Sequence, residues 1–412
     1  MRLFFHSRQG LLALVVMAFF ISNCGEISLG SADDLNSDTA EVVEFSEAAT
    51  LDSYAFALAT DFASSSQLYF LSLAGSTTTI TNSGVQELGS SGVIHLFDDL
   101  LYVLHDGYSL ISSDNLQIID PLDSYKTYGQ WSTGNGTNPH DVAVTGLRAF
   151  VSLYNPSADI ENFDSEGLPG DVIEMNLSDG SITHRYAFTN YLNADDAQAA
   201  LAGDLLLQGN QLYVLIQDLD PNTFAADAAG KLGIINVQTH TIEDVLTLQG
   251  RNPTSLALSA DGKRLFISHM ATYDYTSQSF DTTTEFGGIE IVNLTTLTTE
   301  AFLNDEDLGG YVEQLMVSDD FVYAVVSNVT EGNFTSILTQ LPQNATDANE
   351  AVTFDDSGTD IRATIFQNGF LWISRQGAGG ANPEIEIYNE VTGEKVGDSL
   401  LPVATAMSFT SL

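Results

Sequence analysis

The sequence is almost free of cysteine. Cys24 is the single cysteine among 412 residues. One thiol cannot form a disulfide within the chain, and it cannot supply a metal site of several thiolates or the cysteine pair that attaches a c-type haem. The stability of the fold must therefore come from its packed core.

Basic residues are also scarce. The chain has 12 Lys and Arg residues against 55 Asp and Glu residues, which gives a formal net charge of −43 at pH 7. Such a field repels the phosphates of nucleic acids and attracts cations. The composition argues against nucleic acid as a partner. It is typical of proteins that stay soluble in saline water, where salt screens the repulsion between carboxylates.

The apolar run near the N-terminus is too short to cross a membrane. It extends from Leu11 to Ile21, eleven residues, whereas a helix needs about 20 residues to span a bilayer. Two arginines, Arg2 and Arg8, precede the run. A positive segment followed by a short apolar segment is the pattern of a secretory signal peptide.

The lone cysteine follows this run directly. Residues 21–24, Ile-Ser-Asn-Cys, resemble the lipobox of bacterial lipoprotein signal peptides. The resemblance implies that residues 1–23 are a signal peptide and that Cys24 is the lipidation site. Gly25, rather than Asp, follows the cysteine. The resemblance therefore implies a cell-envelope protein of the outer membrane, held there by its lipid anchor only.

The rest of the chain divides into a tether and one repeating domain. Residues 24–50 are small, polar and acidic, which is typical of a flexible tether. From residue 51 to 412 short β-rich runs alternate with turn residues, and the second strand of one type of hairpin recurs seven times. The second strand of each hairpin contains an aromatic residue, and these are Phe56, Tyr102, Phe150, Tyr213, Phe266, Tyr323 and Trp372.

The hairpins predict an all-β fold, a seven-bladed β-propeller. Six of the aromatic strands follow a matching apolar strand, but the first, Tyr54 to Leu58, has none before it. The missing strand is found at the other end of the chain, at Ala404 to Phe409. We expect this C-terminal strand to close the first blade, which leaves no open edge in the ring.

Residues 51–412 resemble the YVTN-type seven-bladed β-propellers. Residues 252–268 read Asn-Pro, strand, Asp-Gly, strand, as that repeat does, and residues 138–144 are a second copy of its start. Other blades use different turn dipeptides such as Asn368-Gly369. The resemblance implies the fold and says little about function.

Loop lengths indicate which face of the propeller carries a site. In a four-stranded blade the connections between second and third strands lie on one face together with the links between blades. The connections on this face are long, at 155–170, 218–230, 270–287 and 376–383. Long loops on a rigid scaffold are where binding residues concentrate.

We expect ligand-binding residues where second strands end and first strands begin on that face. These are His105, His140, Asp141, Arg251, His269, Glu313, Arg362, Arg375 and Tyr154. Tyr154, together with Tyr273 from a long loop of the same face, could stack on a flat ligand or a sugar, although loop packing is the alternative role. Clustered arginines can hold a carboxylate or phosphate through paired hydrogen bonds. The alternative is that each arginine neutralises carboxylates between blades.

One loop on this face is a weak candidate for calcium, the one cofactor that we consider. Asp159, Glu161, Asp164 and Glu166 offer the hard oxygen ligands that calcium takes. They lack EF-hand spacing, and solvated acidic loops are expected at this composition. The spacing of the histidines does not indicate a metal site.

No recognised catalytic motif appears in a fitting context. We therefore expect a monomeric, non-catalytic binding or interaction module whose partner is a small molecule, a glycan or an envelope protein. The repeat also resembles propeller lactonases, which use His, Arg and Glu around the mouth of the central channel. That resemblance implies lactone hydrolysis as the alternative, with His140 and Glu313 as its catalytic candidates beside Arg362 and Arg375.

Overall fold

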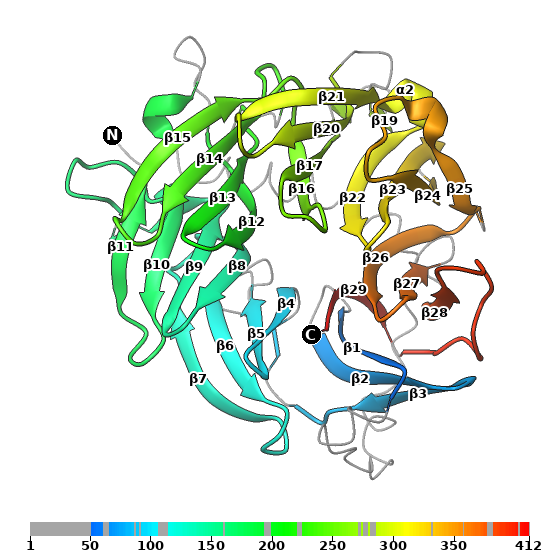
Figure 1. Cartoon of the computed structure of the whole chain (residues 1–412). Helices are drawn as coiled ribbons and strands as arrows, with labels where there is room; N and C mark the ends of the chain where they lie inside the picture. The colour runs from blue at the N-terminus through cyan, green and yellow to red at the C-terminus, as the bar shows by residue number, and fades with distance from the viewer. Residues whose placement is uncertain are drawn as a thin grey trace, which may run out of the picture.

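The structure is a ring of seven antiparallel β-sheets around a central axis (Figure 1). It is a computed structural model, and it describes residues 51–411. Within this range it leaves out 61–65, 86–87, 90–91, 106–113, 160, 193–198, 221–224, 271–272, 275–278, 281–285, 331–332, 357, 377–381 and 403. The expected signal peptide, Cys24 and the tether lie outside the described residues. The predicted seven-bladed propeller is confirmed.

We number the blades in chain order and give their strands from the axis outwards. Blade 1 contains β29 (Thr405–Thr410), β1 (Ser53–Thr60), β2 (Ser66–Ala74) and β3 (Thr77–Asn82). Blade 2 contains β4 (Gly92–Phe97), β5 (Leu100–His105), β6 (Asn115–Asp120) and β7 (Lys126–Ser132). Blade 3 contains β8 (Pro139–Thr145), β9 (Arg148–Leu153), β10 (Val172–Asn176) and β11 (Ile182–Tyr186).

The remaining four blades follow the same order. Blade 4 contains β12 (Ala202–Gln208), β13 (Gln211–Ile216), β14 (Lys231–Asn236) and β15 (Thr241–Thr247). Blade 5 contains β16 (Pro253–Leu258), β17 (Arg264–His269), β20 (Gly288–Asn293) and β21 (Thr298–Asn304). Blade 6 contains β22 (Tyr311–Val317), β23 (Phe321–Thr330), β24 (Asn333–Pro342) and β25 (Val352–Asp355). Blade 7 contains β26 (Asp360–Gln367), β27 (Phe370–Gln376) and β28 (Glu384–Asn389).

A few elements depart from this plan. Outside β28, blade 7 has only isolated bridges, from Ile385 to Leu400 and from Tyr388 to Lys395. Blade 5 carries an extra two-stranded hairpin between its second and third strands. The extra strands and short helices are β18 (Tyr273–Asp274), β19 (Ser279–Phe280), η3 (Pro156–Ala158), η4 (Thr189–Tyr191), α2 (Asp305–Leu308) and η5 (Ala348–Glu350). Among the described residues, no helix is long or apolar enough to span a bilayer.

The ring is closed by the two ends of the described chain, as the sequence predicts. Strand β29 pairs antiparallel with β1, with Phe409 opposite Ala57. The junction with blade 7 is tied by Gln367, whose Oε1 accepts from the Ser53 hydroxyl at 2.7 Å and from the Tyr54 N–H at 2.8 Å. Trp372 Nε1 also donates to Ser53 Oγ at 2.9 Å. The last strand is therefore an integral part of the first blade.

The core lies between neighbouring blades. All seven recurrent aromatic side chains are buried, none more than 4% exposed. Phe150 of blade 3, for example, belongs to one apolar cluster with Leu212 and Val214 of blade 4. Because every blade buries both faces against its neighbours, the aromatic column identified in the sequence is core packing.

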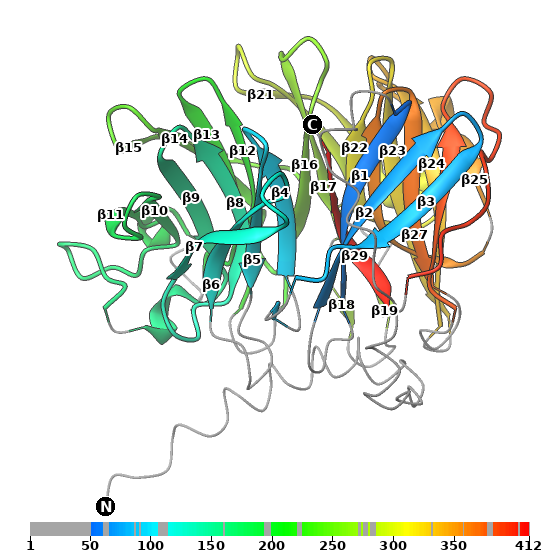
Figure 2. The same cartoon turned by 90° about the horizontal axis from the view of Figure 1, so that it is seen from below.

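Each sheet runs between two faces of the ring, which Figure 2 shows from the side. We call the end with the turns between first and second strands the turn face, and the opposite end the loop face. On the turn face, Gly262 in the turn before β17 has a φ of 69°, the left-handed region that glycine adopts most readily. Blade 6 is an exception on the loop face, because β23 and β24 form one continuous hairpin from Phe321 to Pro342.

Candidate binding site around the ring axis

Six of the seven innermost strands carry a β-bulge near the loop face. The pairing register shifts in β8, β12, β16, β22, β26 and β29, and it is regular only in β4. A bulge leaves a residue without a cross-strand partner and redirects its side chain. The residues at this position, which we call the bulge ring, are Met407, His140, Gly203, Thr254, Glu313 and Arg362. Three of them are predicted ligand-binding residues.

The residue that follows the bulge connects one blade to the next. In blades 1, 3, 4 and 5 it is Ser408, Asp141, Asp204 and Ser255. Each side chain accepts a hydrogen bond from a backbone N–H of the next innermost strand. The donors are Ile94 at 3.1 Å, Leu205 at 2.7 Å, Leu256 at 3.3 Å and Leu315 at 3.3 Å. Asp141, one of the predicted site residues, thus has a structural role in the ring.

Asp141 also binds the preceding blade. Its Oδ1 lies 2.6 Å from His95 Nε2 on β4 and accepts from the Val142 N–H at 2.8 Å. Burial opposes the charging of His95, but the Asp141 carboxylate, with a further contribution from Asp204, raises the pKa of this imidazole. His95 and Asp141 therefore form an ion pair that joins blades 2 and 3.

Asp204 is a second carboxyl group in the same place. Burial and the nearby Asp141 carboxylate raise the pKa of Asp204 to about 8. The Leu256 N–H, His95 and Ser255 favour the ionised carboxylate and so limit this rise. Two carboxyl groups close together resist being ionised at once. The pair is therefore best described as one carboxylate and one carboxylic acid at neutral pH.

Glu313 and Arg362 lie in a second cluster, across the junction of blades 6 and 7. Arg362 Nη2 is 2.5 Å from Asp360 Oδ2, and its guanidinium lies over the Phe334 ring at 5.5 Å. Glu313 Oε2 accepts from the Ser327 hydroxyl at 2.8 Å. Burial raises the pKa of Glu313, although the Ser327 hydroxyl and the Arg362 charge oppose the rise. Burial also raises the pKa of Asp360, with Arg362 opposing.

His140 lies on the other side of the ring, on β8, while β22 and β26 lie opposite (Figure 1). Its side chain is exposed, yet the surrounding protein lowers the pKa of the imidazole by desolvation. The ring of Tyr154 lies 5.4 Å from that of His140, and the Tyr154 hydroxyl donates to Gln217 Oε1. A Cβ on Gly203 would stand 3.8 Å from His140 Cδ2, so the imidazole lies beside the next blade.

Three of the predicted ligand-binding residues are instead buried, two of them inside their own blade and one between two blades. His105 accepts from the Gly89 N–H at Nδ1 and lies 2.9 Å from Gln117 Oε1 at Nε2. His269 Nε2 lies 3.2 Å from Glu290 Oε2, and both side chains are fully buried. Burial lowers the pKa of His105. These imidazoles contact the third strand of their own blade.

Arg375 is the third buried residue. Its guanidinium is 1% exposed and lies 2.7 Å from Glu386 Oε2 and 2.5 Å from Asp355 Oδ2. These carboxylates raise the pKa of Arg375 against the effect of burial. Arg375 therefore neutralises carboxylates of blades 6 and 7, as the alternative interpretation of the sequence proposes for the arginines.

Arg251 and Tyr273 are the remaining predicted site residues. Arg251 donates to the Ala226 carbonyl at 3.1 Å, and its guanidinium lies 3.9 Å from the Phe286 ring. The side chain of Tyr273 lies outside the described part of the structure.

The calcium candidates are held by their own loop. Asp159 accepts from the Glu161 N–H at 2.9 Å, and Asp164 accepts from the Glu166 N–H at 2.9 Å. Within the described residues, the four candidate carboxylates do not gather within ligand distance of one another. Calcium binding there stays a prediction.

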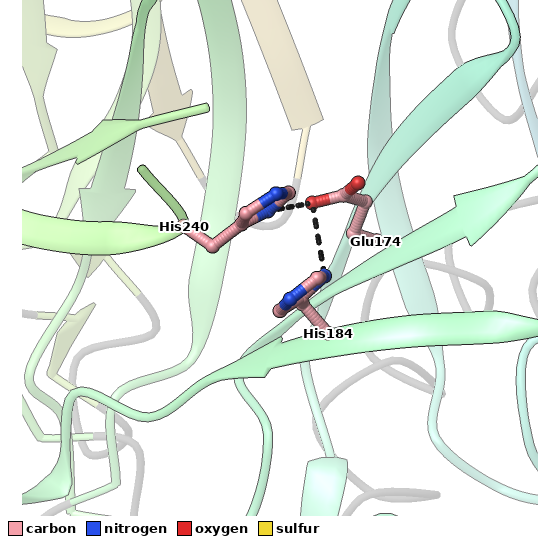
Figure 3. A group of neighbouring side chains, drawn as sticks. All are labelled: Glu174, His184 and His240. Atoms are coloured by element: carbon pink, nitrogen blue, oxygen red, sulfur yellow. Dashed lines mark hydrogen bonds and ion pairs between the residues drawn. The ribbon is translucent and has the colours of Figure 1, made fainter. Parts of the chain in front are cut away.

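A cluster that the sequence analysis missed lies between blades 3 and 4, where Glu174, His184 and His240 converge (Figure 3). A signal for it exists in the repeat. In blades 2, 4, 5 and 7 the third-strand residue that pairs with the column aromatic is isoleucine. In blade 3 it is Glu174, opposite Phe150. Packing of the blades does not need an acid at a position that four other blades fill with isoleucine, so the acid indicates another role.

Similarity to known proteins is found at the level of structure. No family model matches the sequence, and no curated protein matches it. Among solved structures, the chain is similar to the β-propeller domain of Cps50 (Swd1) from Myceliophteria thermophila, with a TM-score of 0.48 and 12% identity over 77% of this chain and 88% of that one. The protein is a seven-bladed β-propeller.

The raised pKa of Asp204 predicts a pH-dependent stability. The folded state keeps this group protonated up to about pH 8, whereas an unfolded aspartic acid releases its proton near pH 4. The folded state therefore binds more protons between these values, and its stability falls as pH rises through them. Asp204→Asn mimics the neutral acid, so we expect it to stabilise the protein by about 1–2 kcal/mol at pH 8 and far less at pH 5.

Urea unfolding at the two pH values measures this difference. Exposed Asp123, which pairs with Lys126 at 3.5 Å on the surface, provides the control substitution Asp123→Asn. A gain for Asp204→Asn that is equal at both pH values, or a loss at pH 8, would contradict the raised pKa.

Proposed function

We propose that the protein is a non-catalytic binding propeller that holds a small, hydroxyl-bearing ligand such as a sugar at the bulge ring. The observation that carries the proposal is the repeat position shared by His140, Glu313 and Arg362. Bulges on innermost strands redirect these side chains on the loop face, where binding residues of a rigid scaffold concentrate. Ionisable groups with shifted pKa values at one place support a functional site as well.

The charges around the ring favour a neutral ligand over an anion. Arg375 is buried against two carboxylates, and Arg362 is paired with Asp360. Within the described residues, Arg362 and Arg375 therefore have no surplus charge to offer a carboxylate or phosphate at this axial position. Arg362 and His140 still offer donors, and Glu313 offers an acceptor. Hydroxyl groups donate and accept, so they match such a mixed set, and the Tyr154 ring beside His140 suits a sugar face.

The same proposal includes the location and the repeat type inferred from the sequence. The signal-like segment before Cys24 supports a lipid-anchored protein of the outer membrane. The Asn-Pro and Asp-Gly repeats support a relationship with the YVTN-type propellers. A tethered propeller at the cell envelope would present its loop face to a nutrient, a glycan or an envelope protein.

Ligand binding is tested by equilibrium dialysis of the protein against a panel of monosaccharides and short oligosaccharides, with mass spectrometry as the readout. We expect one or more sugars to be retained. Arg362→Gln and His140→Ala should each weaken retention about tenfold, because each removes a hydrogen bond to the ligand. Circular dichroism of both variants verifies that the ring is still folded.

Lys263 provides the matched control for these two substitutions. It lies on the turn face beside Asp261, and its side chain is 70% exposed. Lys263→Ala should bind as the original protein does. An equal loss from Lys263→Ala would place the site elsewhere. Consumption of lactones from a parallel panel, abolished by Glu313→Gln, would favour the alternative of a propeller hydrolase.

Lipidation is tested by labelling growing cells with an alkyne fatty acid. We expect the label in the full-length protein and its loss in Cys24→Ser, because the cysteine sulfur is the atom to which the lipid is attached. Fractionation should place the labelled protein in the outer membrane. Equal labelling of Cys24→Ser would overturn the assignment of the anchor.

A further inference from the structure

Glu174, His184 and His240 bring three metal-ligating groups together at the surface between two blades (Figure 3). Glu174 lies on β10 and His184 on β11, both in blade 3, whereas His240 lies in the turn before β15 of blade 4. Their candidate ligand atoms all lie within 4.8 Å of one another. Glu174 is 2% exposed, while the side chains of His184 and His240 are 43% and 32% exposed.

The distances suit one small ion. Glu174 Oε2 is 2.9 Å from His240 Nδ1 and 3.6 Å from His184 Nδ1. Ligands held at about 2.0–2.1 Å by a tetrahedral zinc ion lie roughly 3.3 Å apart, a value between these two distances. Both nitrogens approach the same carboxylate oxygen. The imidazole rings are stacked, with centroids 3.7 Å apart and planes at 8°, so one ring must rotate about its Cβ–Cγ bond before both in-plane lone pairs point at the ion.

The fold does not require these residue types at these positions. Glu174 replaces the buried isoleucine that four other blades carry opposite their column aromatic. His240 has a φ of 55°, and Leu297 has a φ of 52° at the same place in the equivalent turn of blade 5. In both turns an asparagine, Asn236 or Asn293, accepts two backbone N–H groups. Leucine therefore serves this turn as well as histidine.

Neighbouring side chains orient the carboxylate. Tyr186 donates its hydroxyl to Glu174 Oε2 at 3.0 Å, and Arg148 Nη1 lies 3.6 Å from the other oxygen, Oε1. Arg148 is itself held by the Val237 carbonyl at 2.5 Å. Such second contacts fix the direction in which a ligand oxygen points. Oε2 is the oxygen that faces both histidines.

We propose that Glu174, His184 and His240 form a zinc-binding site that bridges blades 3 and 4. Two imidazoles and one carboxylate are ligands that suit zinc. Solvent reaches the site beside the exposed His184 and the half-buried His240, so a water molecule completes the four ligands. The strong negative charge of the chain concentrates cations near it. The site is separate from the bulge ring, and it holds whether or not the sugar-binding proposal does.

The test uses the full chain, stripped of metal with a chelator and dialysed against zinc chloride. We expect one zinc ion per chain, a higher melting temperature with zinc, and a tetrahedral absorption spectrum when cobalt replaces zinc. Binding to the folded state alone raises stability as the ion concentration rises above Kd. His240→Leu, the residue found in blade 5, should keep the melting temperature of the metal-free protein and weaken zinc binding at least tenfold.

His184→Gln provides a second variant with the same expected loss of zinc, since it removes a ligand from an exposed strand. Asp123→Asn is the control, because it removes an exposed carboxylate from blade 2, outside the cluster, and should leave zinc binding unchanged. The proposal is overturned if the original protein takes up no zinc. It is equally overturned if His240→Leu binds zinc as tightly, or if magnesium binds as well as zinc, which would indicate the acidic surface instead.

Discussion

The ring depends on hydrogen bonds that cap the free edges of its innermost strands. Each innermost strand pairs on one side only, so the N–H groups on its other edge need acceptors. Side chains of the preceding blade supply them at the residue after the bulge, as Asp141 does for Leu205 and Ser255 for Leu315. One bulge position therefore serves two purposes: it shifts the strand, and it places an acceptor against the next blade.

This arrangement also explains where ligand-binding side chains can lie. In four blades the residue after the bulge is committed to the neighbouring blade. The bulged residue is less uniform: Thr254 donates to the Glu313 carbonyl of the next blade at 3.2 Å, whereas Gly203 has no side chain that could do so. His140, Glu313 and Arg362 vary in chemistry at a position where blade 4 has Gly203 and blade 5 has Thr254. Variation at a structurally permissive position is what a scaffold needs to acquire specificity. The zinc site follows similar logic, since His240 stands where Leu297 serves as well.

Much of the fold could be predicted from the sequence. The aromatic of each second strand, the turn dipeptides and the unmatched strand at Ala404 to Phe409 identify seven blades and their closure. The buried partners could not be predicted. The sequence pattern of a polar residue at the end of a second strand does not differ between a side chain that faces solvent and one that contacts an acid of the third strand. His269 and Arg375 contact Glu290 and Glu386 in this way, and only the strand register reveals it.

Amide hydrogen exchange tests the central claim, that neighbouring blades cap the free strand edges. The N–H groups of Ile94, Leu205, Leu256 and Leu315 lie on unpaired edges, yet each has a side-chain acceptor from the preceding blade. If these bonds cap the edges, the four amides exchange only when the whole ring unfolds, as slowly as amides in the middle of the sheets. Fast exchange of these four amides in the native protein, at the rate of exposed loops, would contradict it.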